Sequence, residues 1–222
     1  MSEYKVVEKF ISINGEGTLA GQLAVFIRFK GCNLNCNYCD TKWANKADAP
    51  FEVMTENDIY DYIKSTGIKN VTLTGGEPLI QKDIITLLKK LASDNNIHVE
   101  IETNGSADIS EAAAIPNRPS FTVDYKLPDS GMEKFMLTEN YAFLDRRDTV
   151  KFVVSSPSDL EKARQIITEY KLTDKCPVYF SPVFGRIEPS EIVEFMIKHE
   201  LNGINMQLQL HKFIWDPDKR GV

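Results

Sequence analysis

The sequence has little of several residue types and segments that mark common classes of protein. Its 222 residues include only three histidines, two tryptophans and four cysteines. No run approaches the ~20 apolar residues that a membrane span needs, and the charged start MSEYKVVEKF does not resemble a signal peptide. These absences predict a cytoplasmic protein with no membrane partner, in which thiols stay reduced and clustered cysteines indicate metal or redox chemistry.

Basic residues are also in short supply. The sequence has 26 Lys and Arg against 32 Asp and Glu, which gives a formal net charge of −6. Because proteins that bind a nucleic-acid backbone usually present a broad basic face, we expect no nucleic-acid partner.

Repeats, low-complexity tracts and a recognisable linker are absent as well. Residues 1–222 are therefore predicted to form a single domain, near the upper end of the usual length.

What the sequence does contain is an alternation of strand-like and helical segments. Strands are predicted at 23–31, 70–76, 98–105, 120–126, 148–156, 176–183 and 204–213. Helices are predicted at 55–65 with Thr55 as N-cap, and at 82–95, 110–115, 158–171 and 189–200, with an irregular stretch at 127–147. This alternation indicates an α/β fold with a parallel sheet covered by helices. Six or seven strands are too few for a full barrel of about 250 residues, so we predict an incomplete (β/α) barrel with residues 1–22 as a separate N-terminal hairpin.

The most unusual segments follow the ends of predicted strands. They are the cysteine loop after 23–31, TGGEP at 74–78, ETNG at 102–105 and DYK at 124–126. Since the carboxyl ends of parallel strands meet at one edge of a sheet, and the loops there carry the chemistry of such folds, we expect these segments to form one site.

The cysteine loop KGCNLNCNYCDT, residues 30–41, holds three of the four cysteines, Cys32, Cys36 and Cys39. Structural zinc takes four protein ligands, and the histidines lie far along the chain. A [4Fe–4S] cluster takes one ligand per iron, so three thiolates would leave one iron open. On spacing alone, a zinc loop and reduced structural thiols stay open as alternatives.

Two motifs together, CNLNCNYC and then TGGEP, resemble the radical S-adenosylmethionine (radical SAM) superfamily. The resemblance implies a [4Fe–4S] cluster on the three cysteines, SAM on its open iron, and reductive cleavage of SAM to a 5′-deoxyadenosyl radical. It implies a SAM site of Tyr38, Gly75, Gly76, Glu77, Asp124, Tyr125 and Lys126, with backbone contacts more than side-chain contacts in the last three. Thr103, Asn104, Ser181 and Pro182 are weaker candidates. TGGEP by itself also fits an ordinary strand-to-helix turn.

Longer segments, SINGEGTLAGQLAVFIRFKGC, CDTKWA and QLQLHKFIW, resemble the 7-carboxy-7-deazaguanine synthase family over nearly the whole chain. The resemblance implies conversion of 6-carboxy-5,6,7,8-tetrahydropterin to 7-carboxy-7-deazaguanine with loss of ammonia. It implies SAM, a [4Fe–4S] cluster and Mg²⁺ as cofactors, a homodimer, and an electron donor such as flavodoxin or ferredoxin. The implied substrate residues are Ile13, Asn14, Gly15, Glu16, Arg28, Thr74 and His211. Thr41 is the implied Mg²⁺ ligand, with Asp40 ranked second.

Each of these residues also has a plainer interpretation. The INGEG segment fits a hairpin turn, Arg28 a surface ion pair, Thr41 a helix cap, and His211 a structural residue of a terminal strand. Cys176 matches no role and is predicted to be a buried thiol.

The resemblance implies that the radical abstracts hydrogen from C6 of the pterin, so no acid–base triad is expected.

A second interpretation within the superfamily is an activating enzyme that generates a glycyl radical on a partner protein. Such an enzyme would not need INGEG or QLHKFIW. A different class is a non-catalytic zinc or electron-transfer module, and neither version explains TGGEP.

Overall fold

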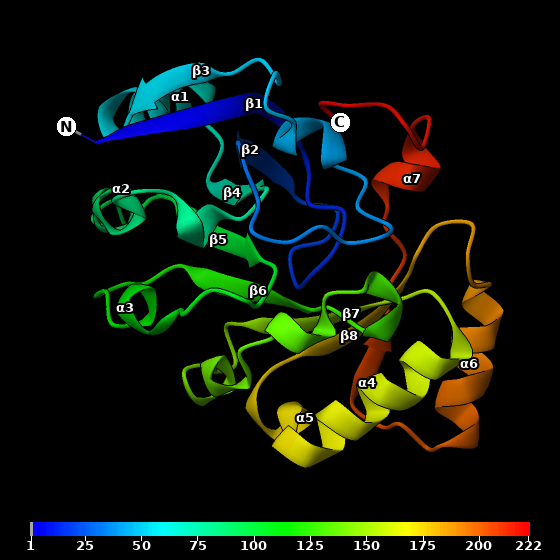
Figure 1. The fold of residues 1–222 in the computed structure, drawn as a ribbon. Helices are drawn as coiled ribbons and strands as arrows, with labels where there is room; N and C mark the ends of the chain where they lie inside the picture. The colour runs from blue at the N-terminus through cyan, green and yellow to red at the C-terminus, as the bar shows by residue number, and fades with distance from the viewer. Residues whose placement is uncertain (1) are drawn as a thin grey trace.

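A single nine-stranded sheet runs through residues 2–222, the part of the chain that the computed structural model describes (Figure 1). Its order is β3-β1-β2-β4-β5-β6-β7-β8-β9. The strands are β1 (Glu3–Ile13), β2 (Leu23–Phe29), β3 (Glu52–Thr55), β4 (Asn70–Gly75), β5 (His98–Thr103), β6 (Ser120–Tyr125), β7 (Thr149–Val154), β8 (Val178–Pro182) and β9 (Ile204–Met206). Each neighbouring pair from β2 to β9 is parallel, whereas β1 is antiparallel to both β2 and β3.

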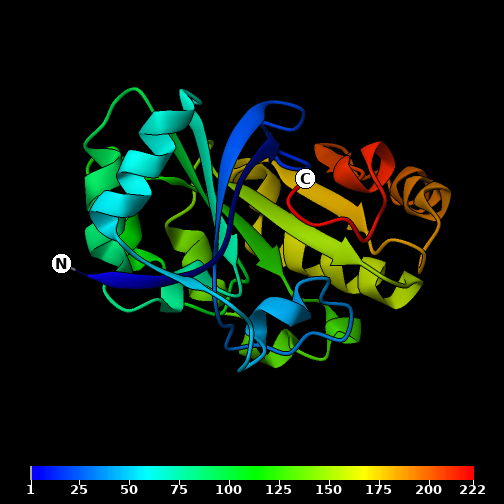
Figure 2. The ribbon, with the colours of Figure 1, turned by 90° about the horizontal axis from the view of Figure 1, so that it is seen from above.

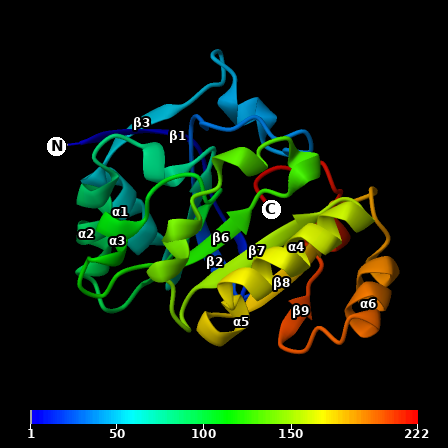
Figure 3. The ribbon, with the colours of Figure 1, turned by 60° about the horizontal axis from the view of Figure 1, so that its bottom comes forward.

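Helices follow most of the parallel strands, as the alternation predicts. They are α1 (Glu56–Thr66), α2 (Ile84–Ala92), α3 (Ser110–Ala113), α4 (Pro157–Tyr170), α5 (Leu172–Lys175), α6 (Pro189–Lys198) and α7 (His211–Ile214). Figure 2 shows helices of the N-terminal half on one side of the strands and helices of the C-terminal half on the other, and Figure 3 shows α4 lying along β7 and β8. None of these helices is long and apolar enough to cross a membrane.

Local sequence signals explain where these helices begin and end. The Thr55 hydroxyl accepts a hydrogen bond from the Asp58 N–H, and the Asp58 carboxylate accepts one from the Thr55 N–H, which forms a capping box. Gly67 ends α1 in a left-handed conformation, with φ of 70°. The predicted Thr55 cap is therefore confirmed. The irregular stretch at 127–147 is also confirmed, because it contains only short 3₁₀ turns.

Side chains alternate across the sheet, and this alternation separates two environments. Apolar residues of the central strands face the helices and form the core, including Ile27, Leu73, Ile101, Phe121, Val150, Phe152 and Phe180. The intervening residues face the barrel interior and are largely polar: Arg28, Thr72, Thr74, Glu100, Glu102, Thr122, Asp124, Lys151 and Ser181. The fold therefore buries its apolar surface outside the barrel and keeps the interior polar.

The sheet is curved but does not close, which confirms the incomplete barrel. In the described residues β3 and β9 are its two edges, and no ladder joins them. The loop between β1 and β2 crosses the open side. There the Gly17 N–H donates to the Gln207 side chain at 2.7 Å, and the Leu210 N–H donates to the Gly15 carbonyl at 3.1 Å. These polar contacts connect the β1–β2 loop to the segment after β9, where strand pairing between β3 and β9 would be needed to close the barrel.

Two predicted elements were placed wrongly. Residues 1–22 do not form a separate hairpin, because β1 is one long strand that pairs with β2 from Ile13↔Leu23 onward and also pairs with β3, which the sequence did not predict. The N-terminal hairpin therefore consists of β1 and β2. The predicted terminal strand at 204–213 ends at Met206, because the chain then turns to cover the barrel opening, and His211 starts the short helix α7.

Candidate active site

A pocket of about 520 Å³ opens at the carboxyl ends of the parallel strands, as expected for this fold. It is lined by most of the residues predicted from the sequence: Ile13, Gly15, Glu16, Arg28, Cys32, Cys36, Tyr38, Cys39, Asp40, Thr41, Thr74, Gly75, Gly76, Thr103, Asn104, Asp124, Lys126 and His211. Asn14, Glu77, Tyr125, Ser181 and Pro182 are not part of its wall. The fold thus brings together segments from the beginning, middle and end of the chain.

The cysteine loop lies on one side of this pocket and is held from behind by the irregular segment after β6. The Asn37 N–H donates to the Ser130 carbonyl at 3.0 Å, and the Asn37 side chain donates to the Asp129 carbonyl at 3.0 Å. The Tyr38 hydroxyl donates to the Val153 carbonyl on β7 at 3.2 Å. These contacts hold in place a loop that forms no β-sheet hydrogen bonds itself.

Burial raises the pKa of the Cys32 and Cys36 thiols, and Lys126 opposes this effect at Cys36. In residues 2–222 no group of three or more His, Cys, Asp or Glu side chains is arranged to hold a single metal ion. An iron–sulfur cluster does not require the thiolates to converge on one ion, because each thiolate binds a separate iron. Three thiols facing one pocket fit that donor set.

The glycines of TGGEP allow β4 to end against the backbone that leads into the cysteine loop. A Cβ on Gly76 would lie 1.7 Å from the Gly31 carbonyl oxygen, and one on Gly75, where φ is +138°, would lie 2.4 Å from the Phe29 nitrogen. The Gly76 N–H donates to the Phe29 carbonyl at 3.1 Å. The close approach seen in this structure is therefore between two segments of the chain, and both glycines also face the pocket.

Glu77 is fully buried behind the pocket wall. Its carboxylate accepts hydrogen bonds from the Thr103 hydroxyl at 2.8 Å and from the Asn104 N–H at 2.7 Å. Burial raises its pKa, and these hydrogen bonds oppose the rise. In this arrangement Glu77 positions Thr103 and Asn104, which do line the pocket. Its predicted contact with the SAM ammonium stays a prediction.

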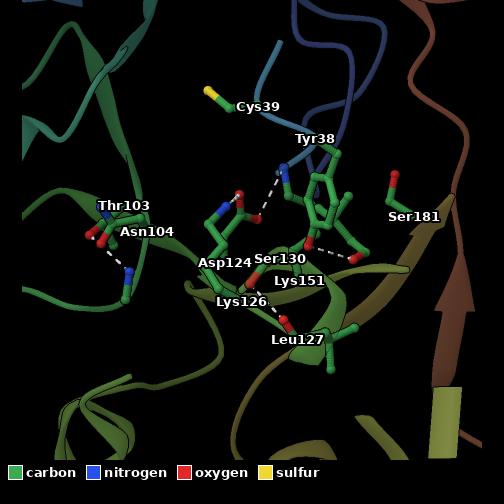
Figure 4. A network of polar contacts seen from close by, with 12 residues as sticks. Tyr38, Cys39, Thr103, Asn104, Asp124, Lys126, Leu127, Ser130, Lys151 and Ser181 are labelled. Atoms are coloured by element: carbon green, nitrogen blue, oxygen red, sulfur yellow. Dashed lines mark hydrogen bonds and ion pairs between the residues drawn. The ribbon is translucent and has the colours of Figure 1, made fainter. Parts of the chain in front are cut away.

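The DYK segment divides between the pocket and the core, and Figure 4 shows its two charged residues, Asp124 and Lys126. Asp124 and Lys126 line the pocket and form an ion pair at 2.9 Å. Burial favours a raised pKa for Asp124, but Lys126 and Lys151 outweigh it and lower the pKa. Because side chains alternate along a strand, Tyr125 points the other way and packs against Phe152, with ring centroids 5.6 Å apart. A role for Tyr125 toward SAM is thus restricted to its backbone.

The INGEG turn is fixed against the C-terminal segment. The Glu16 carboxylate accepts hydrogen bonds from Ser181 on β8 and, at 3.3 Å, from the Gln209 side chain. A Cβ on Gly15 would lie 2.7 Å from Nδ1 of His211, so a larger residue at position 15 would displace the imidazole from its present place. Burial lowers the pKa of His211, which favours the neutral imidazole. His211 therefore faces the pocket, but from a helix and not from a strand.

The remaining predicted residues have mixed positions. Arg28 pairs with Glu8 at 3.0 Å, so the plainer ion-pair interpretation holds, yet both side chains also line the pocket. The Thr41 hydroxyl donates to the Asp40 carboxylate at 2.9 Å. Asn14 is buried beneath the pocket, where its side-chain oxygen accepts from Thr72 at 2.9 Å.

Cys176 is the buried thiol that the sequence predicts. Its side chain is 1% exposed. Burial raises its pKa to about 12, so this thiol stays protonated at neutral pH and lies outside the pocket.

Comparison with known proteins agrees with this site. The family model of the radical SAM superfamily matches residues 26–125. A 7-carboxy-7-deazaguanine synthase from Clostridium acetobutylicum is 61% identical over 219 residues, which cover 99% of both chains. The chain belongs to the 7-carboxy-7-deazaguanine synthase family. A further synthase of this name, from Chlorobaculum tepidum, is 36% identical over 98% of this chain and 96% of that protein.

The fold of this 7-carboxy-7-deazaguanine synthase family member also matches a solved structure. The crystal structure of QueE from Escherichia coli aligns with a TM-score of 0.74 at 23% sequence identity and covers 93% of this chain and 94% of that one. These matches confirm the predicted family and fold. They do not support the alternative of an enzyme that activates a partner protein, or that of a non-catalytic module.

Sequence reasoning missed several polar residues of this synthase-family pocket. Glu8, Glu102, Lys151 and Gln209 all line it. Lys151 is the most buried of the pocket's cations, at 6% exposure. It lies in the segment TVKFVV, for which the sequence predicts a strand but no site residue. The signal that could have found Glu102 is the pair of charged residues at alternate positions of HVEIET, and for Lys151 it is the single charge within the otherwise uncharged strand TVKFVV.

Proposed function

We propose that this protein converts 6-carboxy-5,6,7,8-tetrahydropterin to 7-carboxy-7-deazaguanine by radical ring contraction with loss of ammonia. The observation that carries the proposal is the 61% identity, over 99% of the chain, to a protein named for this product. The site supports it, because one pocket joins the three-thiol loop, the glycine-rich end of β4 and the INGEG turn.

The chemistry at the pocket divides between the cofactors and the chain. When bound, the [4Fe–4S] cluster and SAM supply the radical. Cys32, Cys36 and Cys39 would hold the cluster. Gly75 and Gly76 expose backbone on the same side of the pocket. Asp124 on β6 and Lys126 just after it line the pocket and would contact polar groups of SAM.

On the other side, the chain would bind and orient a flat, polar pterin. Glu16 presents a carboxylate to an amino-pyrimidinone edge, whose N–H groups are donors. Arg28 can form a bidentate pair with the substrate carboxylate, and Glu8 holds the guanidinium through Nε. Thr74 and His211 complete this wall. The chain's own task is orientation and exclusion of water, because the cofactor supplies the reactivity.

The finer parts of the function belong to the same proposal. Mg²⁺ would bind near Thr41, with Asp40 as a neighbouring oxygen donor, since Mg²⁺ prefers oxygen ligands and keeps several waters. We further propose a homodimer, a cytoplasmic location, and an electron donor of the flavodoxin or ferredoxin type. Size-exclusion chromatography with light scattering tests the dimer, and stopped-flow oxidation of a reduced flavodoxin tests the donor.

The experiment that tests the reaction is a product assay. Anaerobically reconstituted and reduced protein is incubated with SAM, Mg²⁺ and the carboxy-tetrahydropterin. We expect 7-carboxy-7-deazaguanine by mass spectrometry, with yield that rises on addition of Mg²⁺. Protein that carries a full cluster and cleaves SAM but forms no such product would overturn the proposal.

A further inference from the structure

Lys151 is a buried cation that no prediction from the sequence assigned to the site. It lies on β7 and points into the pocket, where its side chain is 8% exposed. Its ammonium contacts two carboxylates from different parts of the fold, Glu16 at 3.0 Å and Asp124 at 3.2 Å. Figure 4 shows Lys151 beside Asp124 and Lys126 and behind Tyr38.

These contacts belong to a polar chain that crosses the barrel opening. On one side, Asp124 continues to Lys126 through a 2.9 Å ion pair. On the other side, Glu16 accepts hydrogen bonds from Ser181 and from Gln209. The first side adjoins the cysteine loop, and the second adjoins the INGEG turn. Lys151 is the single residue that touches both sides of this polar chain among the described contacts.

The charge of Lys151 is fixed and is not available for proton transfer. Burial alone would lower its pKa, but Asp124, Glu16 and Glu102 outweigh burial and raise the pKa well above its ordinary value. A buried ammonium of this kind is a poor acid at neutral pH. Its removal would leave Glu16 without a cation and Asp124 with Lys126 alone. A buried carboxylate that loses its cation shifts position or takes up a proton.

We propose that Lys151 is a positioning residue that holds Glu16 and Asp124 with one ammonium and thereby couples the binding of the pterin to the binding of SAM. The inference rests on the proposed function, which assigns Glu16 to the pterin and Asp124 to SAM. A pterin N–H that donates to Glu16 takes part of the carboxylate's charge away from Lys151. The ammonium then interacts more strongly with Asp124 and orders the SAM side before chemistry begins.

The test is a binding measurement on the holoenzyme without reductant, so that no turnover occurs. Isothermal titration calorimetry gives the affinity for SAM with and without saturating pterin. In the parent protein we expect the pterin to tighten SAM binding by about fivefold or more. In Lys151→Met this factor should fall to near one, whereas Lys151→Arg, which keeps the charge, should retain part of it.

The control is Lys64→Met. Lys64 also forms an ion pair, with Asp94 at 2.7 Å, but it lies half-exposed on α1 and outside the pocket. This variant should keep the parent's coupling factor. If Lys151→Met does not fold, Glu16→Gln removes the charge on the other half of the link and should also lower the factor, because the affinity for SAM alone rises toward the value that the parent reaches with pterin bound.

Two results would overturn the coupling: a parent protein that binds both ligands independently, or a folded Lys151→Met protein with the parent's factor. A failure of the proposed function would look different. In that case the product assay would yield no 7-carboxy-7-deazaguanine. The binding measurement needs no turnover, so its result on the coupling of pterin and SAM does not depend on the product assay.

Discussion

The two sides of the pocket are built in different ways. On the cofactor side, all three thiols come from one loop of twelve residues, 30–41. On the substrate side, Glu16 takes its partners from Lys151, Ser181 and Gln209, which lie 135, 165 and 193 residues away along the chain. The cofactor side can be recognised as a sequence motif. The substrate side forms only when the curved sheet brings these distant residues together. Changes on each side should therefore fail in different ways.

The largest effect should come from the thiols of the cofactor side. Replacement of Cys32, Cys36 or Cys39 by alanine removes one of three cluster ligands, and we expect product formation to fall by about a thousandfold or more. Iron content and visible absorption after anaerobic reconstitution should fall in parallel. Cys176→Ala, in the core, is the matched control and should keep its iron. Equal loss of iron in that variant would contradict the assignment.

The second effect separates the scaffold of the cofactor side from its ligands. Gly76→Ala would place a methyl group 1.7 Å from the Gly31 carbonyl oxygen, so β4 or the loop must move. We expect a loss of about 3 kcal/mol or more in the free energy of unfolding, together with weaker cluster retention.

Gly67→Ala is the control for this variant, because Gly67 has φ of +70° and open space around its Cβ position. It should cost about 1 kcal/mol from backbone strain alone. Urea denaturation measures both variants. Similar values would show that the close approach at Gly76 is accommodated easily.

The third effect should come from the substrate side and leave the cluster in place. Glu16→Gln keeps the shape of the side chain but removes the charge that pairs with Lys151. We expect the KM for the pterin to rise by about tenfold or more, while the iron content stays at the parent's value. Steady-state kinetics and calorimetry check this. Loss of the cluster in this variant would contradict the separation of the two sides.

The smallest effect concerns Glu100, below the substrate side. Its carboxylate accepts a hydrogen bond from Thr122, and burial raises its pKa to about 7. Because the native pKa lies above the unfolded value of about 4.3, the protonated form stabilises the fold at low pH. This contribution is lost as the pH rises from the unfolded pKa through about 7.

Glu100→Gln should remove that loss, so its stability should vary less than the parent's between about pH 5 and about pH 8. Urea midpoints across this range give the slope. Glu111→Gln, an exposed position on α3, is the control and should keep the parent's slope. A parent-like slope in Glu100→Gln would show that another group titrates in this range.

Most of the fold followed from local patterns in the sequence. The strand and helix alternation, the Thr55 cap and the irregular stretch at 127–147 all depend on neighbouring residues, and the structure confirms them. The pairing of β1 with β2 and β3 was missed because antiparallel partners of an N-terminal strand leave no local mark. The early end of β9 was missed because the side chains of Gln207 and Gln209 hydrogen-bond to Gly17 and Glu16, far away in the sequence.

For the site, the sequence by itself predicted the three thiol ligands and the order of the motifs. The cysteine spacing and the glycines at the end of β4 are motifs of neighbouring residues, so they can be recognised without the fold. The tertiary structure alone decided that Lys151 meets Glu16 and Asp124, that Glu77 lies behind the wall and that Tyr125 turns into the core. The physical reason is that strand register and sheet curvature select which residues, separated by most of the chain, come within a few ångströms. No local pattern contains that information.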